Sequence, residues 1–346
     1  MTLRRALRFA AHHSGLLPLL HRRQHAATLS AVMLHRVLPT DGDVWPEADP
    51  GYTLSAQLFT DCLRFFRRHY SVVGLHDVLA SIDGGPPLPP CAMLITFDDG
   101  WRDNVTHAWP ILRREGLPAV VFIASDAVTD PSPDWWQDTL LRGLRQGHAS
   151  YQDLWQAVAG DDPQPDVASS DRLARLLLRY GVLDRVTRQR ILAALVPARR
   201  NSQRDMIEPA QLSPISADGL AVGSHGASHL PLSLLPDPAS DLRRSRQALA
   251  ATLGETYVGA RAMSFPHGRY DRRSVAAAVA AGFDIQLCSV PCVNDAPGGR
   301  PASRLLGRIE VPARQIVGEN GELAPDRLAT WLFNRPVRRL AEDVTQ

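Results

Sequence analysis

The sequence contains no lysine, and all 38 of its basic residues are arginine. This absence excludes two chemistries that need a lysine amine: a Schiff base, and the lysine of a phosphate-binding loop. Basic and acidic residues nearly balance, giving a net charge of +2. No dense basic stripe alternates with aromatic residues, so we expect no nucleic-acid partner.

Cysteine and long apolar runs are also scarce. The four cysteines lack the spacing of a disulfide framework or a zinc knuckle, so we expect them to be reduced and packed: Cys62, Cys91, Cys288 and Cys292. No stretch is long and apolar enough to span a bilayer. Residues 1–30 carry arginines around an interrupted apolar segment, unlike a signal peptide. We predict an amphipathic segment that packs on the domain or touches an anionic membrane surface, and a cytoplasmic protein.

Two adjacent carboxylates end the most informative stretch, residues 94–100, which reads Leu-Ile-Thr-Phe-Asp-Asp-Gly. Neighbouring side chains of a strand point to opposite faces, so Asp98 and Asp99 should not do the same job. Two acids side by side at the end of a core strand cost desolvation and repulsion. This favours one acid that holds a metal and another that handles protons. The alternative is an ordinary Asp-Asp-Gly turn.

A second strand-end motif lies at residues 220–229, Leu-Ala-Val-Gly-Ser-His-Gly-Ala-Ser-His. His225 and His229 are four apart, so they share one face if the chain turns helical there. Two imidazoles and one carboxylate form a standard set of ligands for a divalent metal. The alternative is a pair of ordinary turn histidines. A third strand-end turn, Phe-Pro-His-Gly, follows at residues 265–268.

Strand-like runs alternate with helical patterns along the chain. Strands are expected at 29–34, 71–74, 92–97, 119–124, 220–223, 261–265 and 283–290. Helices are expected at 55–69, 103–115, 239–253 and 271–281. The alternation predicts an α/β fold in which parallel strands with crossover helices form a barrel. Ligands of such barrels gather at the C-terminal ends of the strands, where all three motifs fall.

The order Thr-Phe-Asp-Asp-Gly, His-x-x-x-His and Phe-Pro-x-Gly-x-Tyr-Asp resembles the polysaccharide deacetylases. This is the NodB-homology, carbohydrate esterase family 4-like group of metal-dependent carbohydrate N-deacetylases. The segments around the first motif are also similar to that family: residues 33–39, 101–104 and 110–119. The resemblance implies a distorted (β/α)7 barrel.

The resemblance also divides the chain. We expect an N-terminal segment, a deacetylase domain and a C-terminal tail, at residues 1–30, 31–310 and 311–346. A helical insertion is expected at about 134–207, and a short amphipathic helix in the tail at 324–340. Trp135 and Trp136 open the insertion, where they could stack on sugar rings or anchor the insertion by burial.

The resemblance implies a role for each motif residue. Asp98 becomes the general base, and Asp99, His225 and His229 become ligands of a divalent metal, with Zn²⁺ preferred. The backbone N–H of His267 takes the place of the family's oxyanion donor.

The chain departs from the family pattern in three ways. Gly226 stands where the family has Ser or Thr, whose hydroxyl usually steadies the metal loop. Ser264 stands where an Arg usually orients the base, and Arg261 is the nearest substitute. Residues 305–309 lie where the family's general-acid motif should be, and they do not match that motif.

The general acid is therefore left open, with the side chains of His35 and His267 as candidates.

The expected activity is hydrolysis of N-acetyl groups on a polysaccharide, oligosaccharide or glycan precursor, with O-acetyl groups as second choice. The expected partner is this acetylated saccharide. Alternatives are an amidohydrolase for a small non-sugar amide and a catalytically inactive carbohydrate-binding or assembly protein. The long separation between Asp99 and the histidines does not fit the usual spacing of an Fe(II) oxygenase.

Overall fold

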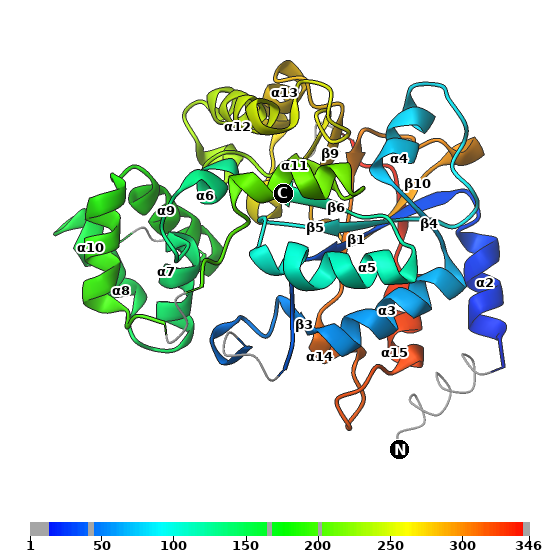
Figure 1. Ribbon diagram of the computed structural model, residues 1–346, viewed down its shortest axis with the longest axis horizontal. Helices are drawn as coiled ribbons and strands as arrows, with labels where there is room; N and C mark the ends of the chain where they lie inside the picture. The colour runs from blue at the N-terminus through cyan, green and yellow to red at the C-terminus, as the bar shows by residue number, and fades with distance from the viewer. Residues whose placement is uncertain (1–13, 41–44, 165–167, 200–202, 342–346) are drawn as a thin grey trace.

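A computed structural model describes residues 14–40, 45–164, 168–199 and 203–341. Parallel strands run through the middle of the molecule, and helices cover them on the outside (Figure 1). The helices α7 to α10 form a lobe at one side of this body (Figure 1). The site described below lies where the lobe meets the barrel.

A curled, half-closed barrel is the core of the fold. Its first six strands pair in parallel, each with the next: β1 (Thr28–Leu34), β5 (Ala92–Phe97), β6 (Val120–Ile123), β7 (Ala221–Ser224), β8 (Ala262–Ser264) and β9 (Ile285–Leu287). Two short strands flank this row of strands, one at each end. β11 (Leu305–Leu306) pairs with β9, and β12 (Ile309–Glu310) pairs with β1. This curled sheet of parallel strands confirms the predicted distorted (β/α) barrel.

Extra strands cause the distortion. β4 (Ser71–Val73) pairs with the first half of β5, so β6 reaches only its second half. β10 (Val293–Asp295) runs antiparallel to the start of β1, and β13 (Val337–Arg338) pairs with β10. A separate two-stranded sheet joins residues 36–38 (β2, Arg36–Leu38) to 53–55 (β3, Thr53–Ser55).

The central strands are continuous apolar runs because both of their faces are buried. Every residue of β1, β5 and β6 is buried, as expected for parallel strands covered by helices. The one polar side chain inside β5, Thr96, donates its hydroxyl hydrogen to the carbonyl of Val32 at 2.8 Å. This bond removes the cost of burying the hydroxyl.

Amphipathic helices cover the barrel: α3 (Ala56–His69), α4 (Leu75–Ile82), α5 (Trp109–Glu115), α11 (Pro209–Ala217), α12 (Pro238–Leu253) and α13 (Arg272–Ala280). Three of the four predicted helices agree to within one residue at each end. The fourth, predicted at 103–115, is a π-helical turn at Asn104–Ala108 followed by α5. A side-chain cap fixes where α3 begins, because the hydroxyl of Ser55 accepts a hydrogen bond from the N–H of Leu58.

The lobe consists of four helices after the short α6 (Ser125–Thr129): α7 (Trp136–Arg145), α8 (Tyr151–Ala159), α9 (Ser169–Gly181) and α10 (Arg185–Leu195). They share an apolar cluster of their own, which includes Leu140, Leu154, Leu176 and Tyr180. The helices thus have a small core separate from the barrel.

The two ends of the described chain meet on one side of the barrel. α2 (Leu16–Gln24) packs against α15 (Pro325–Phe333), which follows the short α14 (Ala313–Ile316). α15 ends at Phe333, so the helix predicted at 324–340 is too long. Pro336 explains this, because the residue before a proline avoids the helical region.

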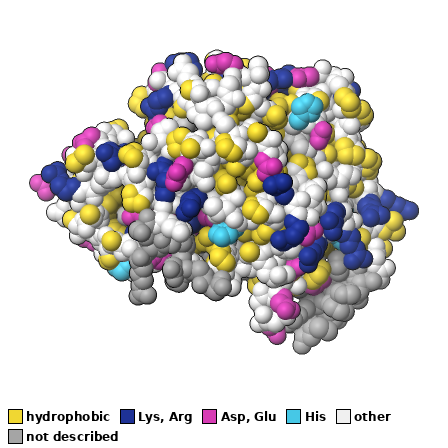
Figure 2. Space-filling view, in the orientation of Figure 1, with side chains coloured by type: hydrophobic (Ala, Val, Ile, Leu, Met, Phe, Trp, Pro, Cys, Tyr) yellow, Lys and Arg dark blue, Asp and Glu magenta, His cyan; other side chains and the backbone are white. Residues whose placement is uncertain are grey.

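Several sequence predictions concern the N-terminal segment and the surface. Residues 1–13 of the segment lie outside the described residues, and β1 already begins at Thr28. None of the described helices combines the length and apolar character needed to cross a bilayer. The four cysteines are buried and unpaired, as predicted. On the face drawn in Figure 2, arginine and acidic side chains are interspersed. The cytoplasmic location and the membrane contact stay predictions.

Candidate active site

The three sequence motifs meet at one end of the barrel. Parallel strands bring their C-terminal ends to the same rim. The Asp pair follows β5, His225 follows β7, and the 265–268 turn follows β8. His35 follows β1, whose Leu34 lies opposite Phe97 of β5. This register places His35 at the same rim as the Asp pair, a point that the sequence left open.

Asp99 and the two histidines converge. The Oδ1 atom of Asp99 lies 3.1 Å from Nε2 of His229 and 3.5 Å from Nε2 of His225. One ligand atom from each of the three lies within 4.8 Å of the others, and all three residues are buried. In the described part of the chain, no other group of three histidines, cysteines or acids converges in this way.

Hydrogen bonds orient both imidazoles toward this point. Nδ1 of His225 lies 2.9 Å from the carbonyl oxygen of Ser264, and Nδ1 of His229 lies 2.7 Å from Oε1 of Gln137. Both partners are acceptors, so each Nδ1 carries the hydrogen and each Nε2 presents its lone pair. This is the tautomer that binds a divalent metal. The residues therefore fit such an ion.

Asp98 has a different environment from its neighbour. Arg308 donates two hydrogen bonds to its carboxylate, at 2.7 Å to Oδ1 and 2.6 Å to Oδ2. The hydroxyl of Ser264 donates a third to Oδ1 at 3.0 Å. Burial alone would raise the pKa of Asp98, but the charges of Arg308 and His225, with the hydrogen bonds from Arg308, together outweigh burial and lower that pKa. Asp98 is therefore held as an anion, and its Oδ2 lies 3.9 Å from Nε2 of His225.

The arginine that binds Asp98 is Arg308, whereas the sequence suggested Arg261. Arg261 lies before the start of β8, at the opposite end of the barrel, where it pairs with Asp83 and Asp284. The assignment was wrong because Arg261 precedes Ser264 by three residues, which in a strand is about 10 Å. Arg308 lies between β11 and β12 and is fully buried. A lone arginine in an apolar segment is the signal that could have found it, because a buried cation needs a partner.

A tryptophan and a strained backbone fix Asp99. The indole N–H of Trp101 donates to Oδ2 of Asp99 at 2.8 Å, which leaves Oδ1 toward the histidines. The φ angle of Asp99 is 77°, a left-handed conformation that an aspartate tolerates better than most residues. Burial would raise the pKa of Asp99, but the neighbouring His229 and His225 hold it well below its usual range.

The segment from His225 to His229 is not helical, contrary to the condition that we attached to the His-x-x-x-His spacing. Gly226 and His229 both have positive φ angles, 72° and 55°. The carboxylate of Asp241, on α12, accepts hydrogen bonds from the N–H groups of Ala227 at 2.7 Å and Ser228 at 3.1 Å. Asp241 thus steadies the loop that lacks the family's hydroxyl after the first histidine.

A family model described as polysaccharide deacetylase matches residues 86–152 and 181–285. The chain belongs to the polysaccharide deacetylase family. It is accordingly a carbohydrate deacetylase, a hydrolase. The break in the match, residues 153–180, falls within α8 and α9 of the lobe. No curated protein matches the sequence.

Three solved structures resemble the deacetylase in fold. A de-N-acetylase from Aggregatibacter actinomycetemcomitans is 17% identical, with a TM-score of 0.53, over 81% of this chain and 93% of that one. IcaB from Ammonifex degensii is 18% identical, with a TM-score of 0.53, over 89% and 97%. The Streptococcus pyogenes deacetylase PplD, in complex with acetate, is 13% identical, with a TM-score of 0.54, over 88% and 98%. At these identities the likeness shows the fold alone.

The two candidate acids of the deacetylase differ in their surroundings. His35 is half-buried and its ring packs against Tyr52, with centroids 4.7 Å apart. Its charge is among the influences that lower the pKa values of both carboxyls. His267 is exposed, and its Nε2 lies 3.1 Å from the carbonyl oxygen of His229. That contact ties the His267 side chain to the loop from His225 to His229.

The tryptophan pair belongs to the framework of the site. Trp135 is buried, with its ring 5.4 Å from Trp101 and 4.9 Å from His229. Trp136 is half-buried and stacks on Tyr180 inside the lobe. Of the two interpretations that the sequence allowed, burial describes Trp135.

Gln137, which follows Trp136, is a partner of His229 that the sequence did not indicate. Nothing local in the sequence shows which face of α7 meets the barrel.

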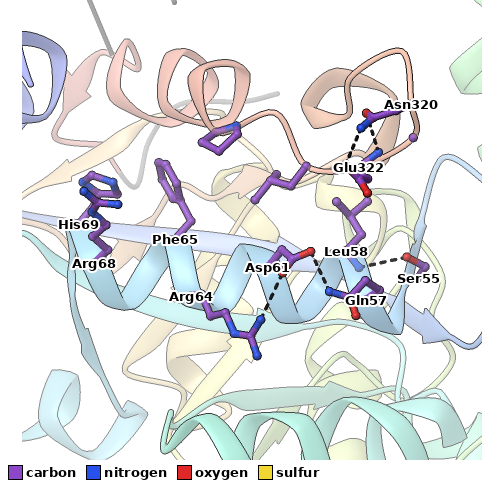
Figure 3. Close-up of a pocket in the computed structure, with 13 residues that line it drawn as sticks. Ser55, Gln57, Leu58, Asp61, Arg64, Phe65, Arg68, His69, Asn320 and Glu322 are labelled. Atoms are coloured by element: carbon purple, nitrogen blue, oxygen red, sulfur yellow. Dashed lines mark hydrogen bonds and ion pairs between the residues drawn. The ribbon is translucent and has the colours of Figure 1, made fainter. Parts of the chain in front are cut away.

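A large groove lies elsewhere on the deacetylase, between α3 and residues 320–325 (Figure 3). Its volume is about 680 Å³. Its polar side chains bond to one another: Asp61 accepts from Gln57 and pairs with Arg64, and Asn320 donates to Glu322 (Figure 3). None of the motif residues lines it, so the groove plays no part in the site.

Proposed function

We propose that this chain hydrolyses N-acetyl groups on a saccharide with the help of a divalent metal ion, preferably Zn²⁺. One observation carries the proposal: the two adjacent aspartates have different main partners. Asp99 converges with His225 and His229, whereas Arg308 donates two hydrogen bonds to Asp98. This arrangement supports a ligand set at Asp99 beside an ionised base at Asp98.

The side chains around the site can carry out the steps of amide hydrolysis. An ion held by Asp99, His225 and His229 would lower the pKa of a bound water and polarise the acyl carbonyl. Asp98 would take the proton of the attacking water, and the hydrogen bonds from Arg308 keep it ionised and fixed in place for this. The backbone N–H of His267 would donate to the oxyanion that forms as the water adds.

The leaving amine must gain a proton, and we assign this step to His35. An imidazole is suited to the task because its ordinary pKa lies near neutrality. His35 lies at the same strand-end rim as Asp98 and is only half-buried. The side chain of His267 is the weaker candidate, since its Nε2 faces the carbonyl of His229.

Several features favour a saccharide substrate. Tyr52, which is 50% exposed, lies against His35 and offers an aromatic face of the kind that sugar rings stack on. A site for a small non-sugar amide would not need such a face. N-acetyl is preferred to O-acetyl because a structural neighbour is named a de-N-acetylase. Ser264 lacks the charge of the arginine that the family usually has at this position, but Arg308, between β11 and β12, supplies a positive charge to Asp98, which favours an active enzyme over an inactive one.

The proposal can be tested by measuring acetate release from three groups of compounds: N-acetylated oligosaccharides, O-acetylated oligosaccharides and small acetamides. We expect release from the first group, its loss on treatment with a chelator, and its return on addition of Zn²⁺. Release from the small acetamides alone would contradict the saccharide assignment. Release that a chelator leaves unchanged would contradict the role of a metal.

A further inference from the structure

Helix α2 presents leucines to solvent and a histidine to the protein. Leu16, Leu19 and Leu20, here called the leucine face, are 53%, 48% and 41% exposed. Together with Arg23 they follow the spacing i, i+3, i+4 and i+7, so they share one side of the helix. His21 lies on the other side and is buried. Adjacent exposed leucines are unfavourable in water, so this face indicates a partner.

Buried contacts hold α2 in this orientation. The ring of His21 stacks on Phe333 of α15, with centroids 3.9 Å apart, and meets the ring of Tyr70 edge-on at 4.7 Å. Nδ1 of His21 also lies 2.8 Å from Nδ1 of His25, which directly follows α2. Turning the leucines inward would break all three contacts. The leucine face is therefore a fixed part of the surface.

Three exposed arginines border the leucine face. Arg22 and Arg23 lie in the last turn of α2. Arg68 lies at the end of α3 that contacts α2 through the rings of Tyr70 and His21. In the part of the chain that the structure describes, none of the three arginines pairs with a carboxylate. Figure 2 shows arginine side chains grouped at the edge of the molecule where α2 lies in Figure 1.

The sequence around α2 carries charge of the same sign. Residues 1–27, which precede β1, contain five arginines and no aspartate or glutamate. Three of these arginines belong to residues 1–13, outside the described residues. A surface with an apolar centre and a cationic border complements an anionic bilayer, which offers negative headgroups above an apolar interior.

A second copy of the chain fits the leucine face less well. In a two-fold symmetric dimer the same patch meets itself, so the arginines of one copy would face those of the other. The face is also small. At about 1.5 Å per residue the nine-residue helix is about 14 Å long, whereas a stable dimer buries about 800 Å² per partner. Charge and size therefore favour a membrane.

We propose that α2 docks this deacetylase on an anionic membrane surface. The helix lies in the plane of the bilayer interface, where the leucine face enters the boundary of the acyl chains. Arg22, Arg23 and Arg68 bind the lipid headgroups, with their aliphatic stems along the apolar boundary. Each attraction is weak, so the docking is reversible and sensitive to salt. The proposal does not depend on the substrate or the metal proposed above.

The test is sedimentation of the full chain with two kinds of vesicle: phosphatidylcholine alone, and two parts phosphatidylcholine to one part phosphatidylglycerol. We expect binding to the anionic vesicles and at least about tenfold weaker binding to the neutral ones. Raising NaCl from about 0.1 to about 0.5 M should release the protein, because salt screens the arginines. A lack of binding to the anionic vesicles, or equal binding to both kinds, would overturn the proposal.

Two variants of the full chain test the two parts of the surface. The triple variant Leu16→Ala, Leu19→Ala and Leu20→Ala removes most of the apolar area but keeps a strong helix former at each position. It should bind the anionic vesicles at least about tenfold more weakly. The double variant Arg22→Gln and Arg23→Gln should weaken binding by a similar factor. If the triple variant fails to fold, the double variant decides.

Matched controls lie on the lobe, away from α2. The pair Val182→Ala and Val186→Ala removes apolar surface from exposed positions, and the pair Arg185→Gln and Arg190→Gln removes two exposed charges. Both controls should bind like the wild type. Unchanged binding in either folded α2 variant would overturn the proposal. A dimer in sedimentation velocity that the leucine substitutions abolish, without vesicle binding by the wild type, would assign the face to a second copy and overturn it too.

Discussion

Asp98 and Asp99 show how two identical neighbouring residues acquire different properties. Both follow the end of β5, Asp99 in a left-handed conformation, and each meets a different main partner. The guanidinium of Arg308 faces Asp98, whereas the imidazoles of His225 and His229 face Asp99. The sequence alone suggested the difference but could not identify Arg308, which comes from a segment more than 200 residues away.

Replacing Arg308 with Met should change the pH dependence of catalysis. Asp98 works as a base only when ionised, and Arg308 lowers its pKa. Without that charge the pKa rises, so the acidic limb of the kcat/KM profile should move to higher pH by about 1–3 units. Metal content should stay unchanged, because no ligand is lost. Arg304→Met, at an exposed position that pairs with Asp284 at the other end of the barrel, is the control. An unmoved acidic limb in a folded Arg308→Met enzyme would show that Arg308 does not set this pKa.

At the scale of elements, the strands were easy to predict and the connections were not. The apolar runs that form the central strands have a strong signal because both faces are buried. The predicted strand at 283–290 is shorter, Ile285–Leu287, and Val293–Asp295 adds a strand that no simple pattern marked. The loop from His225 to His229 depends on Asp241, a contact between distant segments. Such contacts are set by tertiary packing, which local sequence does not encode.

Helix α7 connects the lobe to the proposed metal site through Gln137. The amide oxygen of Gln137 accepts from His229, and its nitrogen donates to the carbonyls of Ser228 and His229, at 3.1 and 3.3 Å. The side chain is fully buried. The lobe therefore helps to orient His229, a ligand of the proposed metal ion, in addition to packing beside the barrel.

Gln137→Leu should weaken metal binding about 10- to 100-fold, the usual effect of losing a partner that orients a ligand. Gln137→Glu keeps an acceptor for Nδ1 of His229 but turns an oxygen toward the carbonyls of Ser228 and His229, so it should restore part of the affinity. Gln146→Leu, at the exposed end of α7, should have no effect. The measurement is a competition titration with a metal indicator. Equal affinities for the wild type and Gln137→Leu would refute the role of this residue.

At the scale of the whole molecule, the two ends of the described chain are joined by buried histidines. The ring of His21 on α2 stacks on Phe333 of α15, with centroids 3.9 Å apart, and its Nδ1 lies 2.8 Å from Nδ1 of His25. Burial, with the charge of His25, lowers the pKa of His21 to about 3. Folding therefore requires a neutral His21.

This requirement predicts a loss of stability in mild acid. The pKa of His21 is lower in the folded than in the unfolded state, where it is 6.5, so below that pH only the unfolded chain takes up the proton. Between pH 7 and pH 5 the resulting loss in the free energy of unfolding is about 2 kcal/mol. Urea unfolding at both pH values should show a loss smaller by this amount in His21→Phe, which keeps the ring stacking. His76→Gln, at an exposed position of α4, should behave like the wild type. Identical pH dependence in His21→Phe and the wild type would contradict the prediction.

The division of labour between the two aspartates is tested most directly in Asp98→Asn, by measuring acetate release and bound metal in the same preparation. The account predicts about one divalent ion per chain, as in the wild type, and a rate lower by about 10²- to 10⁴-fold. Asp99→Asn, measured in parallel, should lose both metal and activity. An Asp98→Asn enzyme that releases acetate at the wild-type rate, or that has lost its metal, would contradict the account.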